Sequence, residues 1–180
     1  MNLITNRITQ ELEPDPIPDP NETSGQLWAR HEAIQTDAAS LFGQTFFFSC
    51  VDVCLGLCLA WANDGARLEA LSKSLERQNV KARLDMFSKH VATKFPAGSK
   101  RRTALDRWIE RAHAAREQRN LMVLGRWVVE ARRHKIVNVL GLPSGSPQST
   151  AYTIAELRAF NEELGALEQE LARLCTHWPV

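Results

Sequence analysis

The feature that most restricts the fold is an almost unbroken apolar run at residues 46–62, with the sequence FFFSCVDVCLGLCLAWA. It contains a single charged residue, Asp52, and falls short of the ~20 apolar residues that a helix needs to cross a bilayer. A helix that is apolar nearly all round is expected to be surrounded by other elements. We therefore predict a central buried helix from about Gln44 to Asn63, and no membrane association.

Asp52 needs a cationic partner in this position, because a carboxylate buried without one is costly. The helical pattern after residue 100 offers candidates. Its apolar stripe of Leu105, Trp108, Ile109, Ala112 and Val123 also includes Arg116 and Arg119. Since this stripe should face the core, we predict a structural ion pair between Asp52 and either Arg119 or Arg116.

Apolar residues recur at helical spacing through most of the chain, from about residue 26, over residues 68–95 and over residues 154–174. Gly43 is expected to separate the first two helices, and Gln78-Asn79 is a possible break in the third segment. Thr153 and Glu156 have the spacing of a capping box. The β-branched residues between 127 and 140 favour a β-hairpin. The predicted fold is mainly α, an up-down bundle of four to five helices with a small β-hairpin before the last helix.

The N-terminal residues 1–24 differ in composition from the rest, since they include the proline-rich and acidic string LEPDPIPDPNETS. Such a segment cannot build a packed core. We predict a disordered or extended arm at 1–24 and one helical domain at 25–178. The acidic arm is a candidate for docking on a basic surface of a protein partner.

The four cysteines indicate free thiols in a reducing compartment. Cys50, Cys54 and Cys58 share one helical stripe, and no His or acidic residue joins them at the spacing of metal ligands. A soft metal is the alternative for such thiols, but core packing is the more common role of a free cysteine. With no secretory signal pattern in residues 1–13, we expect a cytoplasmic protein without metal or cofactor.

Charge is unevenly distributed, although the net charge is only +1. Residues 94–135 hold 12 Lys or Arg against 4 Asp or Glu. A local excess of this kind attracts anionic partners, unless the arginines pair with acids elsewhere in the fold. The candidate RNA- or phosphate-binding side chains are Arg116, Arg126, Arg132, Arg133 and Lys135.

The chain lacks the common nucleotide-binding, zinc and hydrolase motifs, and two short strings carry what functional information it has. Residues 119–127 read RNLMVLGRW, and residues 152–157 read YTIAEL. The first resembles the Arg-Asn-x-x-Val-His-Gly-x-Trp run of a bacterial subgroup of the helical HEPN superfamily. The second is similar to the string that opens the final helix in that subgroup.

The resemblance implies a specific chemistry. In active members of the superfamily, the Arg and the His form a composite site across a homodimer and cleave RNA without a metal. Arginine can clamp a phosphate, and histidine can transfer a proton near neutral pH. Arg119 and Asn120 match the motif, but Leu124 stands in place of the histidine and cannot transfer a proton. His113 and His134 are the candidate substitutes for the missing base.

The resemblance therefore favours a catalytically degenerate, HEPN-like protein of bacterial or phage origin. It implies a homodimer formed through the Arg119 helix that binds RNA or a nucleotide phosphate, or acts structurally, in a defence or toxin–antitoxin setting. One alternative is an active metal-independent endoribonuclease with Arg119, Asn120 and a displaced base such as His113. Another is a protein-interaction module without affinity for RNA.

Overall fold

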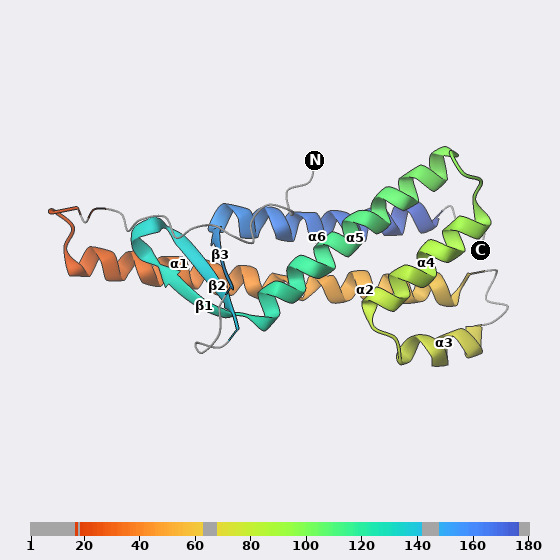
Figure 1. The fold of residues 1–180 in the computed structure, drawn as a ribbon, viewed down its shortest axis with the longest axis horizontal. Helices are drawn as coiled ribbons and strands as arrows, with labels where there is room; N and C mark the ends of the chain where they lie inside the picture. The colour runs from red at the N-terminus through yellow and green to blue at the C-terminus, as the bar shows by residue number, and fades with distance from the viewer. Residues whose placement is uncertain (1–16, 18, 63–67, 142–147, 177–180) are drawn as a thin grey trace. The chain divides into compact units, whose positions relative to one another are not determined.

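The computed structural model describes residues 17, 19–62, 68–141 and 148–176. The chain forms mainly helices, with a small antiparallel sheet before the last helix, which confirms the predicted fold class (Figure 1). The elements in chain order are α1 (Ser24–Gln44), α2 (Phe47–Ala60), α3 (Leu68–Glu76), α4 (Val80–Lys94), α5 (Lys100–Leu124), β1 (Arg126–Glu130), the 3-10 turn η1 (Ala131–Arg133), β2 (Lys135–Leu140), β3 (Gln148–Thr153) and α6 (Ile154–Thr176).

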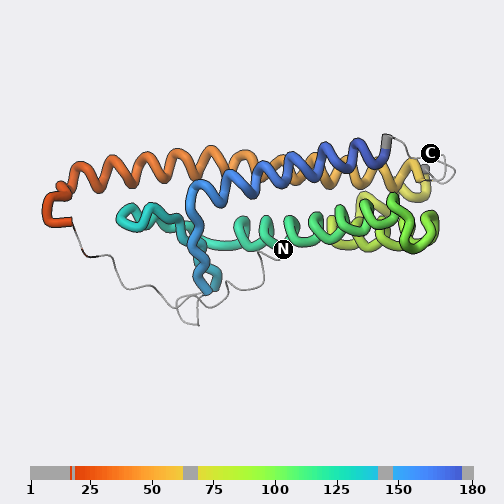
Figure 2. Tube along the Cα trace, turned by 90° about the horizontal axis from the view of Figure 1, so that it is seen from above, coloured from red at the N-terminus to blue at the C-terminus, as the bar shows by residue number. Residues whose placement is uncertain are grey.

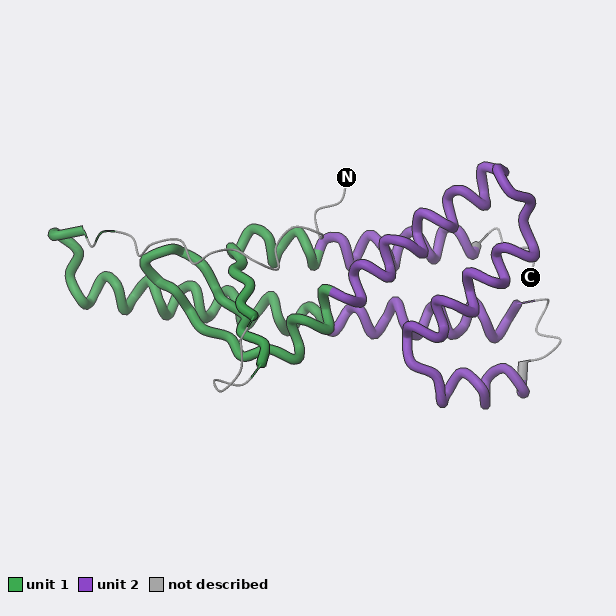
Figure 3. The backbone as a smooth tube through the Cα atoms, in the orientation of Figure 1, with its two compact units in different colours: residues 1–45, 118–161 green, residues 46–117, 162–180 purple. Residues whose placement is uncertain are grey.

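The chain divides into two compact units, which Figure 3 shows in green and purple. Unit 1 comprises residues 1–45 and 118–161, and unit 2 comprises residues 46–117 and 162–180. Most of the predicted arm at 1–24, the last residue of the helix predicted at 44–63 and the end of the predicted domain at 177–178 lie outside the described residues.

Unit 1 contains α1 and a three-stranded antiparallel sheet in the order β1-β2-β3. The predicted hairpin is present as β1 and β2, with His134 in the left-handed region at its turn (φ 51°). The third strand was not predicted, because its sequence QSTAYT is largely polar. The core of the unit lies between α1 and the sheet and includes Ile34, Leu41, Ile136 and Tyr152.

An aromatic cluster ties the sheet to the end of α1 within unit 1. The ring of Trp127 lies 4.3 Å from that of Phe42 on α1 and 5.7 Å from that of Tyr152 on β3, measured between centroids. Aromatic pairs at such distances stabilise a core beyond their buried area. Trp127 in the RNLMVLGRW string is therefore part of the packing of this unit.

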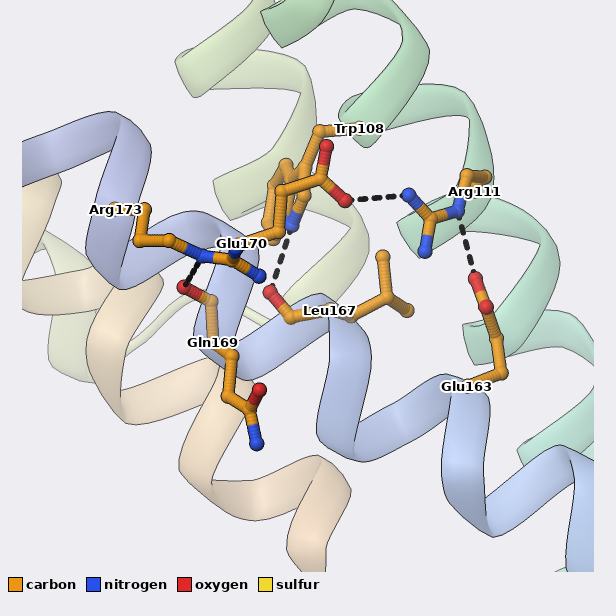
Figure 4. Close-up of polar contacts among 7 residues, drawn as sticks. All are labelled: Trp108, Arg111, Glu163, Leu167, Gln169, Glu170 and Arg173. Carbon is orange, nitrogen blue, oxygen red and sulfur yellow. Dashed lines mark hydrogen bonds and ion pairs between the residues drawn. The ribbon is translucent and has the colours of Figure 1, made fainter.

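Unit 2 is built from helices, and α2 packs on α3 and α4. Its core is fully buried at Leu84, Phe87, Leu105, Trp108, Leu164 and Leu167. The indole Nε1 of Trp108 donates to the carbonyl of Leu167 at 2.9 Å (Figure 4).

Beside this contact, the guanidinium of Arg111 on α5 bridges two carboxylates of α6. It reaches Glu163 at 2.7 Å and Glu170 at 2.5 Å (Figure 4). The hydrogen bond to Glu163 contributes most to raising the pKa of Arg111. These contacts fix the register of α6 against α5 within unit 2.

Local sequence signals explain several helix ends. The break predicted at Gln78-Asn79 is present, because the side chain of Asn79 caps α4 by accepting from the N–H of Ala82 at 3.0 Å. The capping box of Thr153 and Glu156 is confirmed by reciprocal hydrogen bonds of 3.2 and 2.9 Å. The prediction for Gly43 was wrong by two residues, since α1 continues to Gln44.

Candidate functional site

Arg119 and Asn120 lie in the last turns of α5, in the part of the helix that belongs to unit 1. Arg119 is half-buried, and its Nη1 donates to Oδ1 of Asn120 at 3.4 Å. Among the described residues, no carboxylate pairs with Arg119. Within the described part of the chain, this guanidinium is therefore not paired with a carboxylate, and an arginine in this state can bind a phosphate.

The residues that follow the pair hold the junction between α5 and β1. The carbonyl of Met122 accepts from Nε1 of Trp127 at 2.9 Å and from Nδ2 of Asn138 at 3.4 Å. A Cβ at Gly125 would lie 1.9 Å from Oδ1 of Asn138, so this position has room only for glycine. Gly125 and Trp127 of the motif therefore have structural roles.

Among the described residues, none that contacts Arg119 is a general base. Leu124, at the position of the motif histidine, is 77% exposed and carries no titratable group. Nε2 of His113 lies 3.6 Å from Oδ1 of Asp85 on α4, in unit 2. Within the described part of the chain, no hydrogen bond or ion pair joins His113 or His134 to Arg119. The structure therefore does not bring together the three residues predicted as catalytic.

Two of the predicted RNA-binding arginines have acidic partners. The Nη2 atom of Arg116 lies 2.9 Å from Oε1 of Glu117, and Nη1 of Arg133 lies 3.4 Å from Oε2 of Glu130. Lys135 lies opposite Glu130 in the β1–β2 pairing. The charges of these residues are at least partly compensated within the fold.

Arg126 and Arg132 are different, because both are exposed. Arg126 donates from Nη2 to the carbonyl of Gly141 at 2.9 Å, which orients its guanidinium without neutralising it. No described carboxylate pairs with either residue. Together with Arg119 and the exposed Arg158 on α6, they make four described arginines of unit 1 without a described carboxylate partner.

The predicted partner of Asp52 was wrong. Nη1 of Arg83 on α4 lies 2.8 Å from Oδ1 of Asp52, and Nη2 of Arg83 donates to the carbonyl of Leu75 at 2.9 Å. The reason is packing, since α4 lies directly against α2 in unit 2. Arg83 is the only arginine of α4, and this was the one sign in the sequence that it could pair with Asp52. The spacing of residues along a helix does not show which other helix packs on it.

The prediction that residues 44–63 are buried on all sides was also wrong. One face of α2 is buried through Phe48, Val51, Leu55 and Leu59. The other face is apolar and exposed, and at 100° per residue its members span an arc of about 120°. This α2 apolar face comprises Phe46 (74% exposed), Phe47 (52%), Cys50, Val53 (58%), Leu57 (54%) and Trp61 (51%).

By length and composition alone, one helical stretch of the described chain, Ser24–Ala60, is able to cross a membrane. The most apolar part of this stretch is α2, which is only 14 residues long. That corresponds to about 21 Å of helix, against a hydrocarbon core of about 30 Å. Asp52, the one charged residue within α2, forms an ion pair with Arg83.

The cysteines are less buried than predicted. Cys50 is exposed, and Cys54, Cys58 and Cys175 are half-buried. The described residues contain no group of three or more side chains that could hold a metal ion. The Sγ atoms of Cys58 and Cys175 lie 2.8 Å apart, a contact that sequence reasoning missed. Its signal was the place of Cys175 four residues after Leu171 on the apolar stripe of α6.

Comparison of the chain with family models, curated proteins and solved structures finds no match. The likeness to the HEPN superfamily therefore rests on residues 119–127 and 152–157 alone. The geometry adds an arginine–asparagine pair without a described base, exposed arginines of unit 1 that have no described carboxylate partner, and an exposed apolar face on α2 in unit 2.

Proposed function

We propose that this chain is a HEPN-like protein without ribonuclease activity, which acts as a homodimer formed through the α2 apolar face and not through the Arg119 helix that the resemblance implies. As the resemblance implies, we place it in a bacterial or phage defence or toxin–antitoxin setting. The observation that carries the dimer is the exposure of six apolar side chains along one face of one helix. Leu124 in the position of the motif histidine supports the absence of catalysis.

The size of the α2 apolar face sets it apart from ordinary scattered surface residues. Its three aromatic residues, Phe46, Phe47 and Trp61, are each at least half exposed, and Val53 and Leu57 lie between them. Side chains of this size together present on the order of 600 Å², the upper limit of the largest apolar patch on a typical monomer. Patches of this extent mark interaction surfaces.

A second copy of the chain is the occupant that we propose for this face. A twofold interface places the same surface on both partners, so the surface must be complementary to itself. A face with no charged residue meets that condition, because nothing in it repels its own copy. The exposed area also approaches the ~800 Å² per partner of a standard interface.

Light scattering of purified variants tests the dimer. We expect a dimer at tens of micromolar for the native chain and a monomer for Leu57→Glu, because the buried charge in the interface has no partner. Leu124→Glu is the matched control: it places the same charge on an exposed leucine of α5 and should remain dimeric.

A monomeric native chain would contradict the proposal. A dimer that is dissociated by Leu124→Glu but not by Leu57→Glu would also contradict it, because the interface would then lie on α5. The native chain and Leu57→Glu are also compared for binding to phosphatidylcholine vesicles. Vesicle binding by a native chain that is monomeric in solution would assign the α2 apolar face to a membrane surface.

A second candidate function, binding of single-stranded RNA, is supported by Arg119, Arg126 and Arg132, which lie in unit 1 and have no carboxylate partner among the described residues. We expect salt-dependent binding of a fluorescent RNA, weakened in the Arg126→Ala/Arg132→Ala variant. Each lost phosphate contact should reduce the slope of log K against log salt by about 0.7. Arg107→Ala, an exposed arginine of unit 2, is the control. Equal effects of the two variants would contradict a site in unit 1.

A further inference from the structure

Two cysteines from distant parts of the sequence meet at one end of unit 2. Cys58 lies near the end of α2 and Cys175 near the end of α6, and these two helix ends lie side by side in Figures 1 and 2. Their Sγ atoms are 2.8 Å apart. This is less than about 1 Å longer than the ~2.05 Å of a disulfide bond, so a bond requires only small movements of the side chains.

The backbone around Cys175 is held in place by neighbouring contacts. Arg101 on α5 donates from Nη2 to the carbonyl of Leu174 at 3.2 Å, and its guanidinium lies 5.2 Å from the centre of the Phe95 ring. One turn earlier, Leu171 is fully buried. Because these contacts hold the segment around Cys175, the fold itself keeps the two sulfur atoms in contact.

The two thiols differ in acidity, which assigns them different roles. The hydrogen bond with Cys175 lowers the pKa of Cys58 and outweighs the opposing effect of burial. The same hydrogen bond, together with burial, raises the pKa of Cys175. A thiolate is the reactive nucleophile, so Cys58 is the more reactive partner. Burial and the charge of Glu168 raise the pKa of nearby Cys54, which makes Cys54 a poorer competitor.

We propose that Cys58 and Cys175 form a reversible redox pair, in which a peroxide oxidises Cys58 and Cys175 closes the disulfide. The Cys58 thiolate attacks one oxygen of hydrogen peroxide, the O–O bond breaks, and a sulfenic acid and hydroxide form. The sulfur of Cys175 then attacks the sulfenic sulfur. The S–S bond forms, the S–O bond breaks, and the leaving oxygen takes the thiol proton to become water.

In sum, two thiols lose two electrons to the peroxide, and a small dithiol such as dithiothreitol restores them by exchange. The disulfide closes a loop of more than 100 residues within the chain. A loop of this length restricts the unfolded state strongly, so the oxidised protein should melt several degrees higher than the reduced one.

Mass spectrometry of the full-length protein after treatment with hydrogen peroxide tests the pair. We expect a loss of two hydrogen masses per chain, a peptide linking Cys58 to Cys175, and a rise in Tm that dithiothreitol reverses. Cys58→Ser and Cys175→Ser should abolish the link, whereas Cys50→Ser and Cys54→Ser should retain it.

Cys175→Ser gives a readout that a structural role of the thiol would not produce. Without its resolving partner, Cys58 should accumulate as a sulfenic acid that dimedone traps. Sulfenic acid at Cys50 or Cys54 in place of Cys58 would overturn the proposal. A link formed by Cys50 or Cys54, or only between chains, would overturn it too, as would the absence of any link under conditions that oxidise free glutathione.

Discussion

Asp52 illustrates how one residue is accommodated in an otherwise apolar helix. Its carboxylate and the guanidinium of Arg83 are only 27% and 16% exposed, and Arg83 also satisfies the carbonyl of Leu75. Such a pair costs desolvation energy, and the removal of one partner leaves a partly desolvated charge without a counter-ion. The pair therefore fixes how α4 sits on α2 more than it adds stability.

Removing one partner of this pair should be more harmful than removing both. We expect Arg83→Met to lower the free energy of unfolding by about 2–4 kcal/mol, and the double variant Asp52→Leu/Arg83→Met to be closer to the native protein. Urea denaturation gives both values. As a control, Lys73→Ala breaks the exposed pair with Glu69 and should change stability by less than about 0.5 kcal/mol. A double variant less stable than Arg83→Met would be inconsistent with an uncompensated Asp52 charge.

Leu124 decides the catalytic question at the scale of one residue. We expect no cleavage of single-stranded RNA by the native chain, with or without a chelator, because no described group in contact with Arg119 can transfer a proton. Leu124→His supplies that group at an exposed position and should produce metal-independent cleavage. Arg119→Ala in the same background should remove it. Cleavage by the native chain that persists in His113→Ala and His134→Ala would show that a base outside these positions operates.

At the scale of elements, the sequence predicted best where a local signal is sufficient. The spacing of Thr153 and Glu156 located the start of α6, and Asn79, which lies at the possible break predicted at Gln78-Asn79, caps α4. The exposure of α2 was not predictable in this way. The sequence of an apolar helix does not show whether one of its faces or all of them are covered by the rest of the chain. The structure shows that α3 and α4 pack on α2 and that the α2 apolar face stays exposed.

The candidate site was also predicted only where a local signal was sufficient. The motif located Arg119 and Asn120, and their hydrogen bond follows from adjacency on one helix. The role of Asp52 depended on a contact between helices, and spacing within one helix carries no information on its neighbours. Which of the basic residues have an acidic partner was not predictable either. The ion pair of Arg133 with Glu130, for example, depends on the geometry of the β1–β2 turn.

The junction from α5 to β1 offers a test of one element boundary. Gly125→Ala should lower the free energy of unfolding by about 1–3 kcal/mol, because the new methyl group meets the amide of Asn138, which is 3% exposed and has nowhere to move. Asn138→Ala in the same background should recover part of the loss. Gly165→Ala on α6, where nothing lies within 4 Å, should stabilise the protein by about 0.5–1 kcal/mol. Equal effects at the two glycines, measured by thermal unfolding, would contradict this explanation.

At the scale of the whole molecule, the candidate functions are divided between the two units. Unit 1 holds the Arg119–Asn120 pair and exposed arginines without a described carboxylate partner, whereas unit 2 holds the α2 apolar face and the Cys58–Cys175 pair. The net charge of +1 conceals this division. This division is consistent with the proposed assembly and anion binding, and among the described residues no proton-transfer group contacts Arg119.

Cys50 reports directly on the central claim, because its exposed thiol lies in the middle of the α2 apolar face. The measurement is the rate of Cys50 alkylation under reducing conditions, located by fragment mass spectrometry and followed at increasing protein concentration. We expect the rate at Cys50 to fall as dimers form, while the rate at Cys175 stays constant and Leu57→Glu keeps Cys50 reactive at every concentration. A Cys50 rate that does not change with concentration in the native chain would contradict a dimer formed through α2.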